Sequence, residues 1–216
     1  MHITLDKIAS ITRNAHLGRS VVIGPEIPAH DWVIVAVRIL DEKSVYNQVE
    51  DPNGRMMTFH RGDVLAGVLG GRKALRGYTG SVPDTIRIGD VLHLLNKGGV
   101  IGRCTSHSSV VGPPARVEVL GAVLAVPPVG RPAPLTIQQG PVRPLDALPK
   151  ALPPFVLLAG TCMHAGKTAA ACAIIRHATT RGLVVGAAKV TGVALRRDSL
   201  EMSDHGARHV CTFADA

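Results

Sequence analysis

Short runs of apolar residues, separated by Gly, Pro, Asp and Asn, fill the first 126 residues of the chain. Runs of this length between turn-forming residues are typical of short β-strands. Closely spaced strands joined by tight turns indicate a small barrel or sandwich. The pattern therefore predicts a mostly β domain over residues 1–126, with strands at 21–23, 32–40, 45–49, 56–60 and 64–69.

Turn signals support this β-rich prediction. Asp51-Pro-Asn-Gly54 is a strong turn sequence because Asn-Gly tolerates positive φ. A Gly-Asp-Val-Leu sequence occurs twice, at 62–65 and at 89–92, and each copy predicts a turn followed by an apolar strand. Lys97-Gly-Gly99 predicts a further turn into a strand that begins at Val100.

The sequence becomes rich in proline after residue 126. Residues 127–154 hold nine of the fifteen prolines, which exclude regular helix and central strand. We expect an extended, semi-rigid connector here, and therefore a domain boundary.

From residue 155 the pattern becomes that of an α/β domain. An apolar run at 155–159 predicts a strand, 168–181 a helix that Gly182 terminates, and 183–190 a second strand. Such a βαβ unit makes its two strands parallel with a right-handed crossover. A second helix is expected at 199–206, capped by Asp198, and a third strand from Val210.

The segment Gly160-Thr-Cys-Met-His-Ala-Gly-Lys-Thr168 joins the first of these strands to its helix. Strand, glycine-bounded loop, Gly-Lys-Thr and helix is the order of a phosphate-binding P-loop. The loop amides and the helix N-terminus would surround phosphate oxygens, Lys167 would supply a charge, and the Thr168 hydroxyl would bind Mg²⁺. The predicted cofactor-binding residues are Gly160, Thr161, Cys162, Met163, His164, Ala165, Gly166, Lys167 and Thr168. A plain strand–turn–helix junction with an exposed lysine is the alternative.

Two later residues could complete the chemistry. Lys189 ends a strand, where open α/β sheets bind ligands, and we assign it a catalytic role beside Lys167; a structural lysine is the alternative. Asp198 is either a metal ligand with Thr168 or the cap of the second helix. His164 could face the phosphates, whereas Cys162 has no obvious base nearby in sequence to make it a nucleophile.

Composition narrows the choice of partners and compartment. The formal net charge is +8, but the charges are scattered and aromatic residues make up only 3%, which argues against nucleic acid and favours a small anionic metabolite. No apolar run is long enough to span a membrane and no signal-peptide pattern opens the chain. Four widely spaced cysteines predict reduced thiols. We therefore expect a cytoplasmic protein, and a homo-oligomer remains open.

The C-terminal part resembles one branch of the P-loop NTPases. Gly160 to Thr168, with five residues between its glycines, is similar to the P-loop of dethiobiotin synthetase, and Lys189-Val-Thr-Gly192 to a later segment of that enzyme. Asp198 and Gly206-Ala207 are similar to the molybdopterin-guanine-dinucleotide accessory proteins. The two-domain layout is similar to that of the D-glutamate N-acetyltransferase-like family. Cys162 departs from dethiobiotin synthetase, which has an acidic residue there.

The resemblance implies a parallel-sheet domain that uses ATP or GTP with Mg²⁺. It covers only about residues 155–211, and such domains run to about 150 residues with a later Walker-B carboxylate. We therefore expect residues 155–216 to be part of a P-loop domain whose sheet is incomplete.

The leading hypothesis is a two-domain, ATP·Mg²⁺-dependent kinase or ligase that acts on a small metabolite. One alternative is an N-acyltransferase that uses the P-loop for the phosphates of an acyl-coenzyme A. The other is a non-catalytic nucleotide-binding regulatory module.

Overall fold

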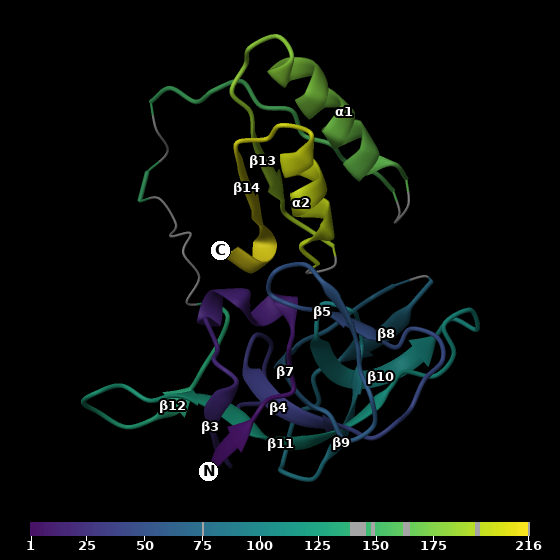
Figure 1. Ribbon diagram of the computed structural model, residues 1–216, viewed down its shortest axis with the longest axis vertical. Helices are drawn as coiled ribbons and strands as arrows, with labels where there is room; N and C mark the ends of the chain where they lie inside the picture. The colour runs from purple at the N-terminus through teal and green to yellow at the C-terminus, as the bar shows by residue number, and fades with distance from the viewer. Residues whose placement is uncertain (75, 139–145, 148–149, 162–164, 193–194, 216) are drawn as a thin grey trace. The chain divides into compact units, whose positions relative to one another are not determined.

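The chain folds as two compact units, which are described separately. A computed structural model describes residues 1–216 except 75, 139–145, 148–149, 162–164, 193–194 and 216 (Figure 1). The first unit is Met1–Gln139 with Val193–Arg196, and the second is Gly140–Gly192 with Arg197–Ala216. The division falls within the proline-rich segment at 127–154.

The first unit is built almost entirely from strands, so the β-rich character predicted for this part of the chain is confirmed. A 3-10 helix, Ser10–Ala15, is its one described helical element. The strands are β1 (His2–Thr4), β2 (Lys7–Ile8), β3 (Ser20–Gly24), β4 (Ile34–Ile39), β5 (Gln48–Glu50), β6 (Met56–Thr58), β7 (Val64–Leu69), β8 (Tyr78–Ser81), β9 (Val91–Leu94), β10 (Val100–His107), β11 (Arg116–Ala125) and β12 (Ala133–Pro134).

Five of these strands close on themselves. β11 pairs with β4 and β4 with β7, both antiparallel. β7 pairs with β10 in parallel, β10 pairs with β9, and β9 returns to β11. The ring is therefore closed without an open edge between these strands. β1 and β3 extend the sheet beyond β11, and β5 and β6 form a separate hairpin.

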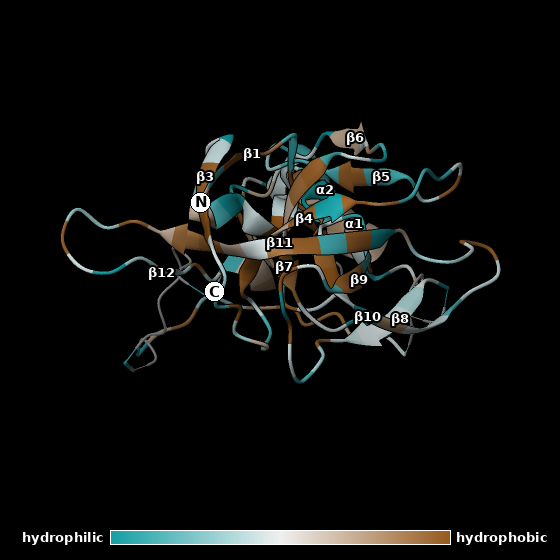
Figure 2. Ribbon diagram, turned by 90° about the horizontal axis from the view of Figure 1, so that it is seen from below, coloured by the Kyte–Doolittle hydropathy of each residue, from teal (hydrophilic) through white to brown (hydrophobic). Residues whose placement is uncertain are grey.

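The core of the first unit lies against the central strands of this ring. Ile34, Val35, Ala36 and Val37 of β4 are all fully buried, so both faces of this strand are covered. Much of β4 and β11 is brown in the hydropathy view (Figure 2). Because the aromatic content is low, aliphatic packing supplies most of the hydrophobic stabilisation, at about 25 cal/mol per Å² of buried apolar surface.

The predicted turns are confirmed. The β5–β6 hairpin turns at Asp51 to Gly54, where Gly54 has a φ of 94° and the Asp51 carboxylate accepts bonds from the amides of Asn53 and Arg55. In the two Gly-Asp turns, Asp63 Oδ2 accepts from the His60 amide and Asp90 Oδ2 from the amide three residues before it, each at 2.8 Å.

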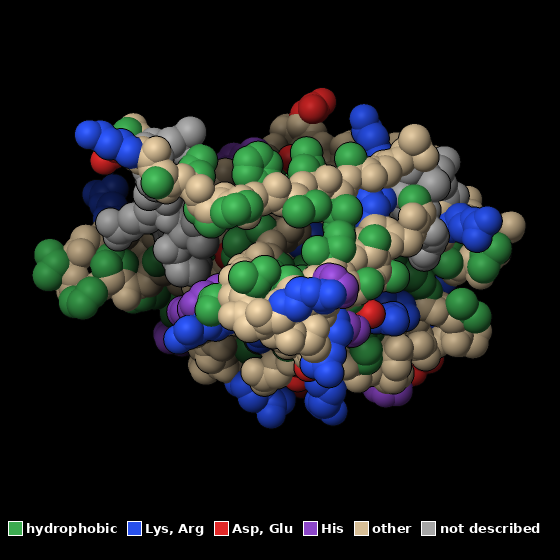
Figure 3. Space-filling view, turned by 90° about the horizontal axis from the view of Figure 1, so that it is seen from above, with side chains coloured by type: hydrophobic (Ala, Val, Ile, Leu, Met, Phe, Trp, Pro, Cys, Tyr) green, Lys and Arg blue, Asp and Glu red, His purple; other side chains and the backbone are tan. Residues whose placement is uncertain are grey.

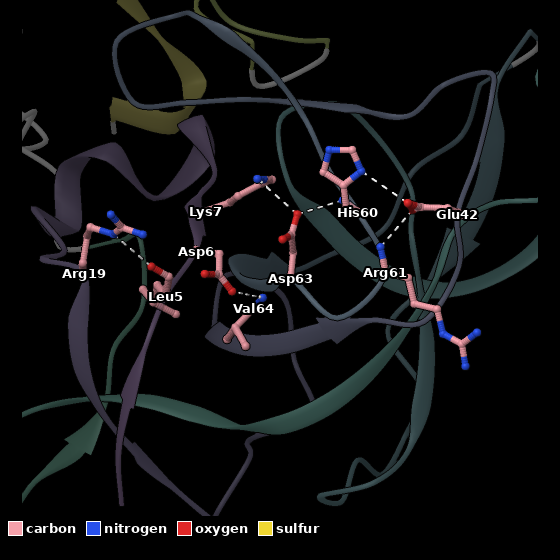
Figure 4. A network of polar contacts seen from close by, with 9 residues as sticks. All are labelled: Leu5, Asp6, Lys7, Arg19, Glu42, His60, Arg61, Asp63 and Val64. Atoms are coloured by element: carbon pink, nitrogen blue, oxygen red, sulfur yellow. Dashed lines mark hydrogen bonds and ion pairs between the residues drawn. The ribbon is translucent and has the colours of Figure 1, made fainter.

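A network of polar contacts fixes the first Gly-Asp turn before β7 (Figure 4). Asp63 also pairs with Lys7 Nζ at 3.1 Å. Glu42 accepts from the Arg61 amide at 2.9 Å and lies 3.3 Å from His60 Nδ1. The Asp6 carboxylate accepts from the first amide of β7 at 2.8 Å. These contacts satisfy the backbone at the turn, so their role is structural.

A pH-dependent contribution to stability comes from Asp41, which pairs with Arg116 at 2.7 Å. The Arg116 hydrogen bond outweighs burial and lowers the pKa of Asp41 below its ordinary value of 3.8. A carboxyl whose pKa is lower in the folded state adds stability above its unfolded pKa and loses it as pH falls through the folded pKa. We expect Asp41→Asn to cost about 1 kcal/mol or less near pH 7, since the pair is partly exposed to solvent, and progressively less as the pH falls through the folded pKa of Asp41. Urea unfolding of both proteins from pH 2 to 7 measures this; a constant difference across that range would contradict it.

The second unit contains two helices and a pair of parallel strands. They are α1 (Lys167–Thr179), β13 (Gly186–Lys189), α2 (Arg197–Asp204), β14 (His209–Thr212) and a closing 3-10 turn, Phe213–Asp215. β13 and β14 pair in parallel from Gly186 with His209 to Lys189 with Thr212, with α2 as the connection. Gly182 follows α1 with a φ of 81°, as expected for a residue that ends a helix.

The small core of this unit lies between the helices and one face of the strand pair. Cys172 and Ile175 of α1 pack with Met202 of α2 and with Ala207. Ala187 of β13, Val210 of β14 and Val185, which precedes β13, pack against this cluster. A single hydrophobic cluster therefore joins both helices to the strand pair.

The strand predicted at 155–159 is wrong. These residues form no ladder with any described strand, and their side chains are exposed, with Phe155 at 82% and Leu157 at 75%. An extended segment becomes a strand only when a neighbour takes its backbone hydrogen bonds. The parallel pair of the second unit is therefore β13 with β14, and not 155–159 with 183–190.

Large hydrophobic side chains remain exposed in the second unit. They include Val156, Leu183, Val184 and Val190, each above 60% exposed. A row of hydrophobic side chains crosses the face seen in the space-filling view (Figure 3). None of these four residues lies in β13 or β14, so the exposed apolar surface belongs to segments outside the strand pair.

Among the residues that the structure describes, none of the helices has the length and apolar character needed to cross a membrane.

Candidate functional site

The start of α1 is shaped by glycine on both sides of the predicted phosphate loop. Gly166, immediately before the helix, has a φ of 78° and a ψ of 8°, a left-handed conformation that side chains disfavour. At Gly160 a Cβ atom would lie 3.1 Å from Lys167 Cδ and 3.2 Å from its Cγ. The aliphatic part of Lys167 therefore lies against Gly160, and the two ends of the loop are close together.

The N-terminus of α1 is suited to a negative charge. The helix has 13 residues, and its first turn contains no acidic side chain and has no side-chain cap at Gly166. The first amides of a helix lack intrahelical partners and carry the positive end of its dipole. Lys167 is the first residue of this turn, so its ammonium adds to the same positive potential.

Lys189 approaches this region from the end of β13. Its side chain is 20% exposed, and its Nζ forms an ion pair with Asp198 Oδ2, whose side chain is 26% exposed. Gly192, with a φ of 118°, lies beside it: a Cβ there would be 3.1 Å from Lys189 Cε. β13 and the following turn thus set the position of one ammonium group.

The two lysines are close enough to influence each other. Burial lowers the pKa of Lys189, the positive charge of Lys167 lowers it further, and Glu201 acts in the opposite direction. Like charges held together inside a structure cost free energy unless a counter-charge joins them. Paired cations with a shifted pKa are a feature of functional sites, where an anionic ligand supplies that counter-charge.

Asp198 is not the cap of the second helix. α2 begins at Arg197, so Asp198 lies inside the first turn, where its negative charge suits the helix dipole. Its carboxylate contacts Lys189 instead of the backbone amides at the helix start. Its assignment to a metal stays a prediction.

The residues present give Mg²⁺ only partial support. Within the described part of the chain, no group of three or more His, Cys, Asp or Glu side chains could hold a metal ion. Thr168, the second residue of α1, offers one hydroxyl oxygen. Mg²⁺ commonly takes one or two protein oxygens and completes its shell with substrate phosphates and water. An ion at this site would therefore have to be bound together with phosphate.

The middle of the predicted loop gives no further information. Cys162, Met163 and His164 lie outside the described residues, so their assignment stays a prediction. Thr161 and Ala165, which flank them, are exposed. The structure thus brings together Gly160, Gly166, Lys167, Lys189 and Asp198 out of the residues that the sequence indicated.

Two residues of this region were not indicated as site residues by the sequence. Glu201 lies one turn after Asp198 on α2 and adds a second negative charge near Lys189. Gly192 allows the chain to turn closely past the Lys189 side chain. The three-residue spacing of Asp198 and Glu201 on a predicted helix was a signal that both carboxylates share a face.

No protein-family model, no curated protein and no solved structure matches this chain.

Proposed function

We propose that the second unit binds the phosphates of a nucleotide, and that the protein is an ATP·Mg²⁺-dependent enzyme of the kinase or ligase type. The observation that carries the proposal is the geometry at the N-terminus of α1, where Gly166 is left-handed and the Lys167 stem lies against Gly160, with Lys189 near enough to interact electrostatically with Lys167. A P-loop-like segment supplies the first lysine and a strand end supplies the second. Phosphate oxygens would receive hydrogen bonds from the loop amides and from both ammonium groups.

Each residue has a separate part in this mechanism. Lys167, at the first turn of α1, holds the outer phosphates and offsets charge that develops during transfer. Lys189 does the same from β13. The Thr168 hydroxyl would be a protein ligand for Mg²⁺, which would neutralise phosphate charge when bound. Catalysis of this type rests mainly on position and charge, which rigid strand and helix ends provide.

We assign recognition of the second substrate to the first unit. The formal net charge of +8 favours an anionic metabolite. The closed ring of strands is a rigid support for loops that could select it.

Ligand binding to the whole chain tests this proposal. Isothermal titration with ATP·Mg²⁺, GTP·Mg²⁺, coenzyme A and adenosine compares ligands that share phosphates or share only the base. We expect ATP·Mg²⁺ to bind and adenosine, its phosphate-free counterpart, to bind at least tenfold more weakly. Equal binding of adenosine and ATP·Mg²⁺ would contradict a phosphate site.

The same titration separates the alternatives. Binding of coenzyme A without ATP·Mg²⁺ would favour the N-acyltransferase. ATP binding with no phosphate release in the presence of a panel of carboxylate and amino-acid metabolites would favour the regulatory module. Phosphate release that depends on one metabolite would identify the substrate class of a kinase or ligase.

A further inference from the structure

The lysine that we assign to phosphate binding already has an anionic partner from the same chain. Lys189 Nζ forms an ion pair with Asp198 Oδ2, and both side chains are partly accessible to solvent, at 20% and 26%. The pair lies within the second unit and joins the end of β13 to the first turn of α2. A ligand can therefore reach the contact without unfolding either element.

Both partners of this ion pair are held by regular structure. The backbone of Lys189 is fixed by the pairing of β13 with β14 and its stem by the turn at Gly192. Asp198 is carried on α2, whose Met202 is buried in the core of the unit. The side chains can rotate, but their backbones stay in reach of each other. The carboxylate is thus held at a high effective concentration beside the ammonium.

Phosphate and the Asp198 carboxylate require the same donor. An ammonium has three N–H groups, and a carboxylate already paired with this one lies close to any phosphate that approaches Lys189. While the Asp198 carboxylate stays paired with Lys189, its negative charge repels an incoming phosphate. The Asp198 carboxylate also places a negative charge against one of two lysines whose positive charges oppose each other.

We propose that Asp198 is an internal competitor of phosphate, which occupies the ammonium of Lys189 and is displaced when a phosphate ligand binds. This inference rests on the proposed function, in which Lys167 and Lys189 bind phosphate. Displacement frees an Asp198 carboxylate beside the ligand, so the metal-binding role predicted for it becomes available only after phosphate binding. The contact therefore sets the order in which anion and metal bind.

The competitor role and a simple metal-ligand role predict different effects of removing the Asp198 carboxylate on metal-free phosphate affinity. If Asp198 competes, its removal strengthens phosphate binding when no metal is present. If it serves only as a metal ligand or as a structural ion pair, its removal leaves metal-free binding unchanged or weakens it. Inorganic pyrophosphate in excess EDTA is the appropriate probe, since it has no base and no metal.

The experiment titrates pyrophosphate into the wild-type chain and the Asp198→Asn, Asp204→Asn and Lys167→Ala variants. Asp204 is exposed and lies at the opposite end of α2 from Asp198, so its substitution changes the net charge by the same amount away from the ion pair. We expect Asp198→Asn to bind pyrophosphate about three- to tenfold more tightly than wild type, as for loss of a partly exposed ion pair. Asp204→Asn should stay within twofold of wild type.

The outcomes separate this inference from the function on which it rests. If Lys167→Ala does not weaken pyrophosphate binding, the phosphate site itself is wrong. If Lys167→Ala weakens binding but Asp198→Asn binds no more tightly than wild type, only the competitor role is overturned. Thermal melts check that the variants fold. Should Asp198→Asn fail to fold, Asp198→Ala, which has the highest helix propensity, provides the same comparison.

Discussion

Replacing Lys167 by alanine should reduce the affinity for ATP·Mg²⁺ about tenfold to a hundredfold. The substitution removes a charge-assisted contact to phosphate, worth about 1.5–3 kcal/mol. It also leaves Lys189 without the second ammonium that makes this region attractive to a polyanion. The fold should persist, because alanine is favourable in the first turn of a helix. Isothermal titration of both proteins measures the change.

Lys150→Ala is the matched control for this prediction. Lys150 belongs to the second unit, is exposed and lies outside the loop at 160–168. Its substitution removes the same charge from the chain, so a similar loss of affinity in both variants would reveal a general electrostatic effect. Equal affinity of wild type and Lys167→Ala would exclude Lys167 from phosphate binding.

The largest effect on stability is expected for Gly99→Ala. Gly99 has a φ of 97° in the turn before β10, and a Cβ atom there would lie 2.1 Å from the Cβ of Ala9, which is fully buried. The left-handed backbone costs about 1–3 kcal/mol with a side chain, and an overpacked core a further 1–3 kcal/mol. We expect a loss of about 3 kcal/mol or more in the free energy of unfolding, measured by urea denaturation.

Gly62→Ala separates the two causes. Gly62 has a nearly equal φ of 95°, but a Cβ atom there would meet nothing within 4 Å. Its substitution should therefore cost only the backbone term, about 1–2 kcal/mol. If both alanine variants lower the free energy of unfolding equally, the close approach of the Gly99 turn to Ala9 does not contribute to stability.

The sequence was sufficient for the β-rich character of the first unit and for its turns. Asp51 to Gly54 and the two Gly-Asp turns depend on residues next to each other in the chain, whose backbone preferences are local. The same holds for the helix α1 and for its end at Gly182. Because these backbone preferences depend on residue type alone, they can be predicted without knowing which strands or helices pack together.

The closure of the strand ring in the first unit could not be predicted from the sequence. β11 pairs with β3, β4, β9 and β12, and its alternating start, Arg-Val-Glu-Val, indicates a strand without indicating any of these partners. Pairing between strands far apart in sequence depends on which edges meet after folding. A pattern with a period of two gives the buried face of a strand but not its neighbour.

In the second unit the sequence by itself determined a glycine-bounded loop, a helix that starts at Gly-Lys-Thr and a lysine at the end of the following strand. Only the tertiary structure decided that residues 155–159 form no ladder with a described strand, that β13 pairs with β14, and that Lys189 pairs with Asp198 within the electrostatic influence of Lys167. The physical reason is that residue types fix which groups can carry charge or turn the backbone. Whether those groups attract or oppose one another depends on distances that only packing sets.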